Sequence, residues 1–179
     1  MFEGLRLKAG LVYTRFHFRK QAEQVIRWTG AVSGARRALL IMPESIQDAT
    51  AVRSVAEYFA KRFSPGNLVV VARADVARQF TLDRGVQLIT VAPADISTWY
   101  LPRRELTQKL KKSTFDIAID MNLDVMLPSA FLCRASEARI RIGFDKQHAD
   151  TFYNFQVRPN PATTFGAACN RLIDCLKMF

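Results

Sequence analysis

The stretch that decides the fold is FDIAIDMNLDVMLPSAFLCRASEARIRIGFD, residues 115–145. Its apolar run Phe115–Met121 predicts a buried strand, Val125–Ala135 predicts a helix, and Ala138–Ile142 predicts a second strand. A strand, a helix and a strand in this order are typical of two parallel strands joined by a crossover helix. We therefore expect a parallel sheet to be built around these residues.

The same alternation continues on both sides of this stretch. Further strands are predicted at 38–42, 68–71, 86–91 and 154–157, and helices at 48–63, 102–112 and 164–178, with a short helix between the second and third strands. Right-handed crossovers would wind these elements into a Rossmann-like three-layer α/β sandwich with a mainly parallel sheet. We expect this domain to span 38–179, which leaves 1–37 as a separate N-terminal segment.

The N-terminal segment is basic. The 179-residue chain has 26 Lys and Arg against 16 Asp and Glu, a net charge of +10, and more than half of this excess lies in residues 1–37. The apolar residues among these cations predict an apolar stripe on helical segments: Leu5, Leu11, Val12, Phe16, Val25, Ile26 and Trp28. Two interpretations stay open, a basic amphipathic anchor for anionic lipid head groups and an ordinary helix that packs on the domain.

Several common functional classes lack their motifs. The sequence has no GxGxxG after the first strand, no P-loop, no GxSxG elbow and no HExxH. Its three cysteines, Cys133, Cys169 and Cys175, form no CxxC pair and lie far from both histidines, so we expect no metal site, no disulfide and no cofactor. No apolar run approaches the roughly 20 residues that span a bilayer, and we expect a cytoplasmic protein.

In such folds, ligands bind at the loops that follow the carboxyl ends of the strands. Because the motifs of the other classes are missing, we expect any catalysis at these loops to depend on carboxylates. Asp48 lies where the loop after the first strand meets its helix. It is either a helix cap or a general base that takes the proton from a sugar hydroxyl as that hydroxyl attacks an activated donor. Asp116 and Asp120 are predicted to be structural hydrogen-bonding groups.

Two segments resemble a known family. Residues 38–63, ALLIMPESIQDATAVRSVAEYFAKRF, look like the opening strand, loop and helix of the bacterial heptosyltransferases, glycosyltransferase family 9. Residues 115–145 resemble the later signature of that family: an apolar strand carrying Asp, a polar loop, a helix, a small residue, basic residues and Ile-Gly-Phe. Glu44 and Gln47 stand where the family has a serine and a glycine.

The resemblance implies site residues. Asp48 occupies the position of the catalytic base, and Ser45 matches a serine of the loop. We expect Ser45 and Asn122 to contact the sugar. The expected contacts to phosphates or head groups are Arg103, Arg104, Lys109, Lys111 and Lys112.

Family members are two-domain enzymes of the GT-B type, and this chain resembles their N-terminal, acceptor-binding half. Three interpretations stay open: a fragment of a longer protein, a domain that works with a separately encoded nucleotide-sugar donor domain, or a domain that has abandoned transfer. If it is active, the chain is a glycosyltransferase that needs a donor-domain partner.

The implied acceptor is an anionic, lipid-linked saccharide of lipopolysaccharide or cell-envelope assembly, reached by peripheral contact with the inner membrane. The alternative is a non-catalytic module that binds a membrane or a protein. We do not expect nucleic-acid binding, because nothing in the sequence resembles a recognition helix or an aromatic RNA-binding strand pair.

Overall fold

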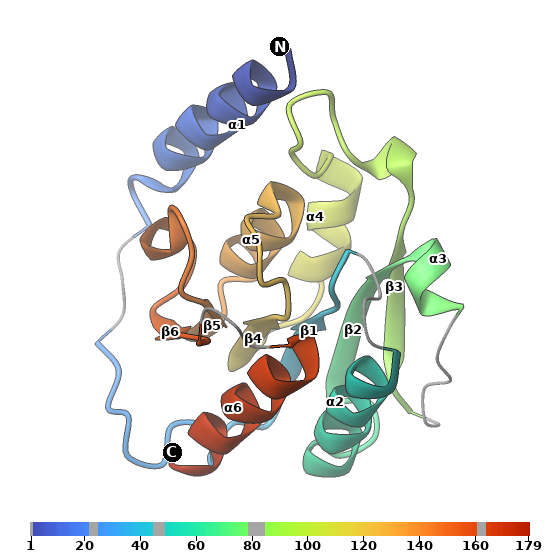
Figure 1. The fold of residues 1–179 in the computed structure, drawn as a ribbon, viewed down its shortest axis with the longest axis vertical. Coiled ribbons are helices and arrows are strands. Elements are labelled where there is room, and N and C mark those ends of the chain that lie inside the picture. The colour runs from blue at the N-terminus through green and yellow to red at the C-terminus, as the bar shows by residue number, and fades with distance from the viewer. Residues whose placement is uncertain (1, 22–24, 45–48, 79–84, 161–163) are drawn as a thin grey trace.

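A six-stranded, fully parallel sheet forms the centre of the protein (Figure 1). The computed structural model describes residues 2–21, 25–44, 49–78, 85–160 and 164–179. The strands are β1 (Ala38–Ile41), β2 (Leu68–Arg73), β3 (Gln87–Val91), β4 (Ile117–Asp120), β5 (Ile140–Phe144) and β6 (Phe155–Val157). Their order is β3-β2-β1-β4-β5-β6, the doubly wound order whose switch point lies between β1 and β4.

Helices cover both faces of this sheet. They are α1 (Phe2–Phe18), α2 (Ala49–Arg62), α3 (Ala74–Ala77), α4 (Arg104–Lys111), α5 (Leu127–Ala135) and α6 (Phe165–Lys177). In Figure 1, α2 and α6 lie below the sheet, whereas α4 and α5 lie above it, with α1 beyond α5. Among the described helices, none is long and apolar enough to cross a membrane.

The central strand β1 shows why the strands read as continuous apolar runs. All four of its residues are buried, because successive side chains point to opposite, helix-covered faces. Leu40 packs in the core under α2 and α6, and Leu39 packs in the core under α4 and α5. The predicted Rossmann-like three-layer fold is therefore confirmed.

Helix α1 packs on α5 through one side only. Leu11, Thr14 and Phe18 are buried, with spacings of three and four residues that place them on one face. Gly10 lies so close to the neighbouring loop that an added Cβ would collide with the Trp99 carbonyl oxygen and come within 2.6 Å of Leu127. The absence of a side chain at position 10 thus allows the close approach of α1.

The predicted N-terminal stripe is wrong in two respects. Val25, Ile26 and Trp28 have no helical structure, so the helix ends earlier than the stripe requires. Leu11 faces the core while Leu5, Val12 and Phe16 face outward, so these residues do not form one stripe. Among the other elements, β5 is displaced at both ends: the prediction is Ala138–Ile142, and the strand spans Ile140–Phe144.

Candidate active site at the carboxyl edge of the sheet

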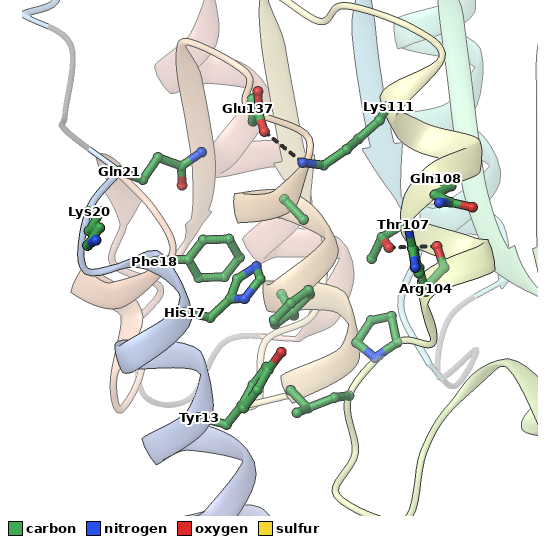
Figure 2. A pocket seen from close by; sticks show the side chains of 14 residues that line it. Tyr13, His17, Phe18, Lys20, Gln21, Arg104, Thr107, Gln108, Lys111 and Glu137 are labelled. Carbon is green, nitrogen blue, oxygen red and sulfur yellow. Dashed lines mark hydrogen bonds and ion pairs between the residues drawn. The ribbon is translucent and has the colours of Figure 1, made fainter.

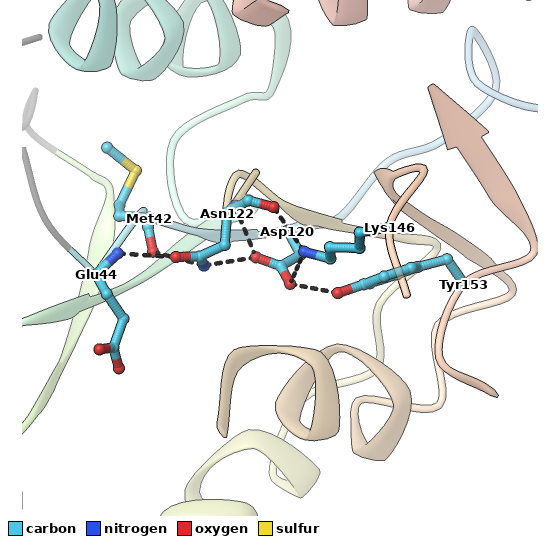
Figure 3. Close-up of polar contacts among 6 residues, drawn as sticks. All are labelled: Met42, Glu44, Asp120, Asn122, Lys146 and Tyr153. Carbon is cyan, nitrogen blue, oxygen red and sulfur yellow. Dashed lines mark hydrogen bonds and ion pairs between the residues drawn. The ribbon is translucent and has the colours of Figure 1, made fainter. Parts of the chain in front are cut away.

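Asp120 anchors a buried polar cluster at the switch point (Figure 3). It is the last residue of β4, lies in register with Ile41 of β1, and is completely buried. Its Oδ1 accepts hydrogen bonds from the Asn122 backbone N–H at 3.0 Å and from Asn122 Nδ2 at 2.7 Å. Its Oδ2 accepts one from the Tyr153 hydroxyl at 2.5 Å and one from Lys146 Nζ at 3.5 Å. Asp120 therefore has the structural role that the sequence predicts.

Lys146 and Tyr153 stabilise the buried carboxylate of Asp120. Lys146 is only 6% exposed, pairs with Asp120 and donates to the Asn122 carbonyl at 2.6 Å. Burial raises the pKa of the Tyr153 hydroxyl well above its ordinary value of 10.0, and the negative charge of Asp120 acts in the same direction. Tyr153 thus stays protonated and remains a hydrogen-bond donor to the carboxylate.

Asn122 connects the loop after β4 to the loop after β1. Its Oδ1 accepts from the Glu44 N–H at 2.8 Å, and its Nδ2 donates to the Met42 carbonyl at 3.4 Å as well as to Asp120. Both amide hydrogens are therefore used, and Oδ1 keeps one lone pair for a further donor. The cluster therefore holds the backbone at Glu44.

Two adjoining hollows lie at this edge. The larger has a volume of about 520 Å³ and is enclosed by the start of α1, residues 93–100, residues 125–128 and Glu44. The smaller, about 80 Å³, is lined by Asn122 and Asp124. Glu44 and Met126 line both hollows, and we refer to the two adjoining hollows together as the crevice.

The walls of this crevice are apolar and acidic. Glu3, Glu44 and Asp124 supply carboxylates, which accept hydrogen bonds from hydroxyl groups and repel phosphates. Glu44 is restrained by an ion pair with Arg73 at 3.6 Å. Within the described ranges, no group of three or more His, Cys, Asp or Glu is arranged to hold a metal ion.

Tyr100 gives one wall an unusual backbone. It has a φ of 58° and lies in a turn closed by hydrogen bonds from Ser97 N–H to the Leu101 carbonyl and from Tyr100 N–H to the Ser97 carbonyl. A large non-glycine residue in this region is strained, and such strain is concentrated at functional sites. The turn presents Tyr100 to the larger hollow.

The predicted site residues that the structure describes lie at several separate places. Ser45 and Asp48 lie outside the described residues, and Asn122 lies in the crevice. Arg103 precedes α4 and donates from Nε to the Ala94 carbonyl at 2.9 Å, next to Pro93 of the crevice wall.

The other cations on and beside α4 do not gather at the crevice. Arg104 and Lys111 line a different cavity, between α1, α4 and α5. Lys109 and Lys112 are exposed. The structure thus divides the five predicted phosphate contacts into separate sites.

The sequence did not point to Lys146 and Tyr153. Lys146 lies two residues after Phe144, the last residue of β5. Tyr153 packs over Gly143, where an added Cβ would come within 2.7 Å of the ring. A glycine in a buried strand is the one local signal for such a close approach.

The parallel sheet, its strand order and the crevice at the switch point define a Rossmann-like α/β domain of the kind found in GT-B glycosyltransferases. Residues 103–175 match the family model of glycosyltransferase family 9 (heptosyltransferase), and the resemblance to this family is thereby confirmed. The matched region contains the 115–145 signature and does not include residues 38–63.

One similar solved structure is E. coli heptosyltransferase WaaC with ADP. It matches with a TM-score of 0.53 and 17% sequence identity, over 79% of this chain and 46% of that chain. This likeness concerns the fold, and the chain spans less than half the length of that neighbour. No curated protein matches the chain.

Proposed function

We propose that the chain is the saccharide-acceptor domain of a heptosyltransferase-type glycosyltransferase, with its acceptor at the carboxyl edge of the sheet. The observation that carries this proposal is the hydrogen bond from the Glu44 N–H to Asn122 Oδ1. It joins the loops after β1 and β4 beside the crevice. In the sequence, Ser45 and Asp48 lie between Glu44 and Ala49, the first residue of α2.

In this proposal Asp48 is the general base. Its carboxylate takes the proton of the acceptor hydroxyl, the hydroxyl oxygen bonds to the anomeric carbon of the donor sugar, and the nucleoside diphosphate leaves with the electron pair of the broken C–O bond. Ser45 contacts the sugar, and Asn122 accepts from a sugar hydroxyl with its remaining lone pair. A separate donor domain holds the nucleotide-sugar.

The acidic crevice and the cations near α4 would contact different parts of an anionic, lipid-linked saccharide of the cell envelope. Its neutral sugar hydroxyls suit the acidic crevice, whereas its phosphates suit the cations on the α4 side. Arg103 is tied to the crevice wall through Ala94. The other proposed phosphate or head-group contacts are Arg104, Lys109, Lys111 and Lys112.

Transfer tests the proposal. The chain is mixed with the donor half of a heptosyltransferase, an ADP-sugar and a phosphorylated lipid A-type saccharide, and product is measured by mass spectrometry. General-base catalysis contributes about 10²–10⁴-fold, so Asp48→Asn should lose at least about 100-fold in rate. Asp174→Asn, an exposed change on α6, is the matched control. Full activity of Asp48→Asn would reject Asp48 as the base, and failure of the wild-type chain to bind the saccharide would reject the proposed function.

A second candidate, a module that docks peripherally on the inner membrane, is favoured by the outer face of α1. Phe2, Leu5, Val12 and Phe16 are 77%, 65%, 67% and 61% exposed. Leu5, Val12 and Phe16 follow spacings of seven and four residues and lie opposite the side that packs on α5. The flanking cations are Arg6, Lys8, Arg15 and Arg19. Apolar side chains between cations suit an anionic lipid surface.

Vesicle co-sedimentation tests this second function. The full chain should bind vesicles that contain phosphatidylglycerol, and more weakly as salt rises. The triple variant Leu5→Ser, Val12→Ser, Phe16→Ser should lose this binding and keep its fold. Met178→Ser, which removes an apolar side chain that is 70% exposed elsewhere, should bind like the wild type. Equal binding of all three proteins would argue against docking through α1.

A further inference from the structure

A second cavity lies on the helical face above the sheet, between α1, α4 and α5 (Figure 2). Its volume is about 860 Å³, within the range of small-molecule sites. Helix α5 forms the floor with Phe131 and Ala135, and Phe18 and Leu101 pack against them. We call this cavity the α1–α4 groove. The residues described as lining it differ from those that line the crevice.

The wall formed by α4 is polar and cationic along its whole length. Arg104, Thr107, Gln108 and Lys111 line the groove, and their spacings of three, four and seven residues place them on one helical face. Leu106 and Leu110 are buried on another face of the helix. Lys111 pairs with Glu137 at 3.0 Å, but both side chains are more than half exposed, so this pair is weak.

The wall formed by α1 is aromatic. The rings of Tyr13 and His17 lie one helical turn apart and stack with centroids 5.5 Å apart and an interplanar angle of 22°. His17 also contacts Phe131 of the floor, with centroids 5.6 Å apart. Figure 2 shows both rings directed toward the space between α1 and α4. Lys20 adds a cation on the α1 side.

We infer that the α1–α4 groove binds a phosphate ester that carries an apolar group. The apolar part would lie on the aromatic wall and floor, and the phosphate would bind Arg104 and Lys111. Lys20, Arg104 and Lys111 supply three positive charges, and Glu137 is the one carboxylate among the described lining residues, so the lining carries a net positive charge that attracts an anion. Apolar contacts with a few convergent polar groups are typical of ligand sites.

This inference extends the proposed function, because it gives Arg104 and Lys111 a common ligand. Its test uses probes without a saccharide, so either proposal can fail alone. Amide chemical shifts of the labelled full chain are followed during titration with decyl phosphate, ADP or inorganic pyrophosphate. Decyl phosphate and ADP distinguish a lipid phosphate from a nucleotide as the source of the shared chemistry.

We expect saturable shifts around Tyr13, His17 and Thr107 with at least one of the two esters. The double variant Arg104→Gln, Lys111→Gln should weaken this binding at least tenfold. Tyr13→Ser should also weaken it. The matched control is Arg53→Gln, Lys61→Gln, which removes the same charge from the exposed side of α2 without touching the groove, and it should bind like the wild type.

Three results would overturn the inference. One is the absence of saturable shifts with both esters. Another is an equal loss of binding in the two double variants, which would indicate a response to net charge. The third is equally tight binding of pyrophosphate, because the apolar floor would then contribute nothing.

Discussion

At the scale of single residues, the buried carboxylate of Asp120 depends on donors that come from outside its own strand. Tyr153 and Lys146, which follow β5 in the sequence, donate hydrogen bonds to Asp120. Asn122 also bonds to Asp120 and accepts a hydrogen bond from the Glu44 N–H, so it links Asp120 to the backbone at Glu44. A buried carboxylate is costly unless it is paired and hydrogen-bonded. These four side chains therefore act together as the support of the crevice.

Tyr153→Phe tests this support. The variant keeps the ring but removes one donor to Asp120, so we expect a loss of about 1–3 kcal/mol in the free energy of unfolding at pH 7, measured with urea. The raised pKa of Tyr153 sets the pH dependence. Above pH 10 the unfolded wild-type chain loses this proton before the folded protein does, so wild-type stability falls as pH rises. The difference in the free energy of unfolding between the wild type and Tyr153→Phe should therefore become smaller above pH 10. A constant difference would show that Tyr153 is not held protonated.

The Tyr153 ring packs against Gly143, and this close approach explains why the Ile-Gly-Phe signature has a glycine at this position. An added Cβ would lie 2.7 Å from the Tyr153 ring, so Gly143→Ala should displace the ring that donates to Asp120. Overpacking of this kind costs about 1–3 kcal/mol, which urea unfolding would measure. An unchanged stability would mean that the ring moves without cost.

At the scale of elements, α1 packs on the domain through one face, which includes Gly10. Alanine is favoured over glycine by about 1 kcal/mol inside a helix, which applies in full to Gly10 and less strongly to Gly4 in the first turn of α1. At Gly4 an added Cβ meets nothing within 4 Å, whereas at Gly10 it collides with the Trp99 carbonyl.

Gly4→Ala should therefore stabilise the protein slightly, while Gly10→Ala should destabilise it or release α1. Urea unfolding would measure the first effect, and protease sensitivity between α1 and β1 would detect the second. Similar behaviour of the two variants would contradict the packing of α1 described above.

At the scale of the whole molecule, the centre of the sheet could be predicted because strands that are buried on both faces are rich in apolar residues, whereas the edge strand β3 is mostly exposed. Ala38–Met42 and Leu68–Val71 are examples of such apolar runs. Strand ends were less exact because they depend on pairing: β5 begins at Ile140, which pairs with Ile117 of β4. The Lys146 and Tyr153 contacts could not be predicted, because they join residues 26 and 33 positions from Asp120 through the crossovers. Composition likewise indicated an apolar, basic N-terminal segment without indicating which face packs.

The central claim is that the crevice between the loops after β1 and β4 binds an acceptor saccharide. The most direct test is an NMR titration of the labelled full chain with a phosphorylated lipid A-type saccharide, with an ADP-sugar titrated separately. We predict saturable shifts at Glu44, Asn122, Asp124 and Tyr100 with the saccharide and no shifts at these positions with the ADP-sugar. Unchanged signals at these four residues in the presence of the saccharide would contradict the claim.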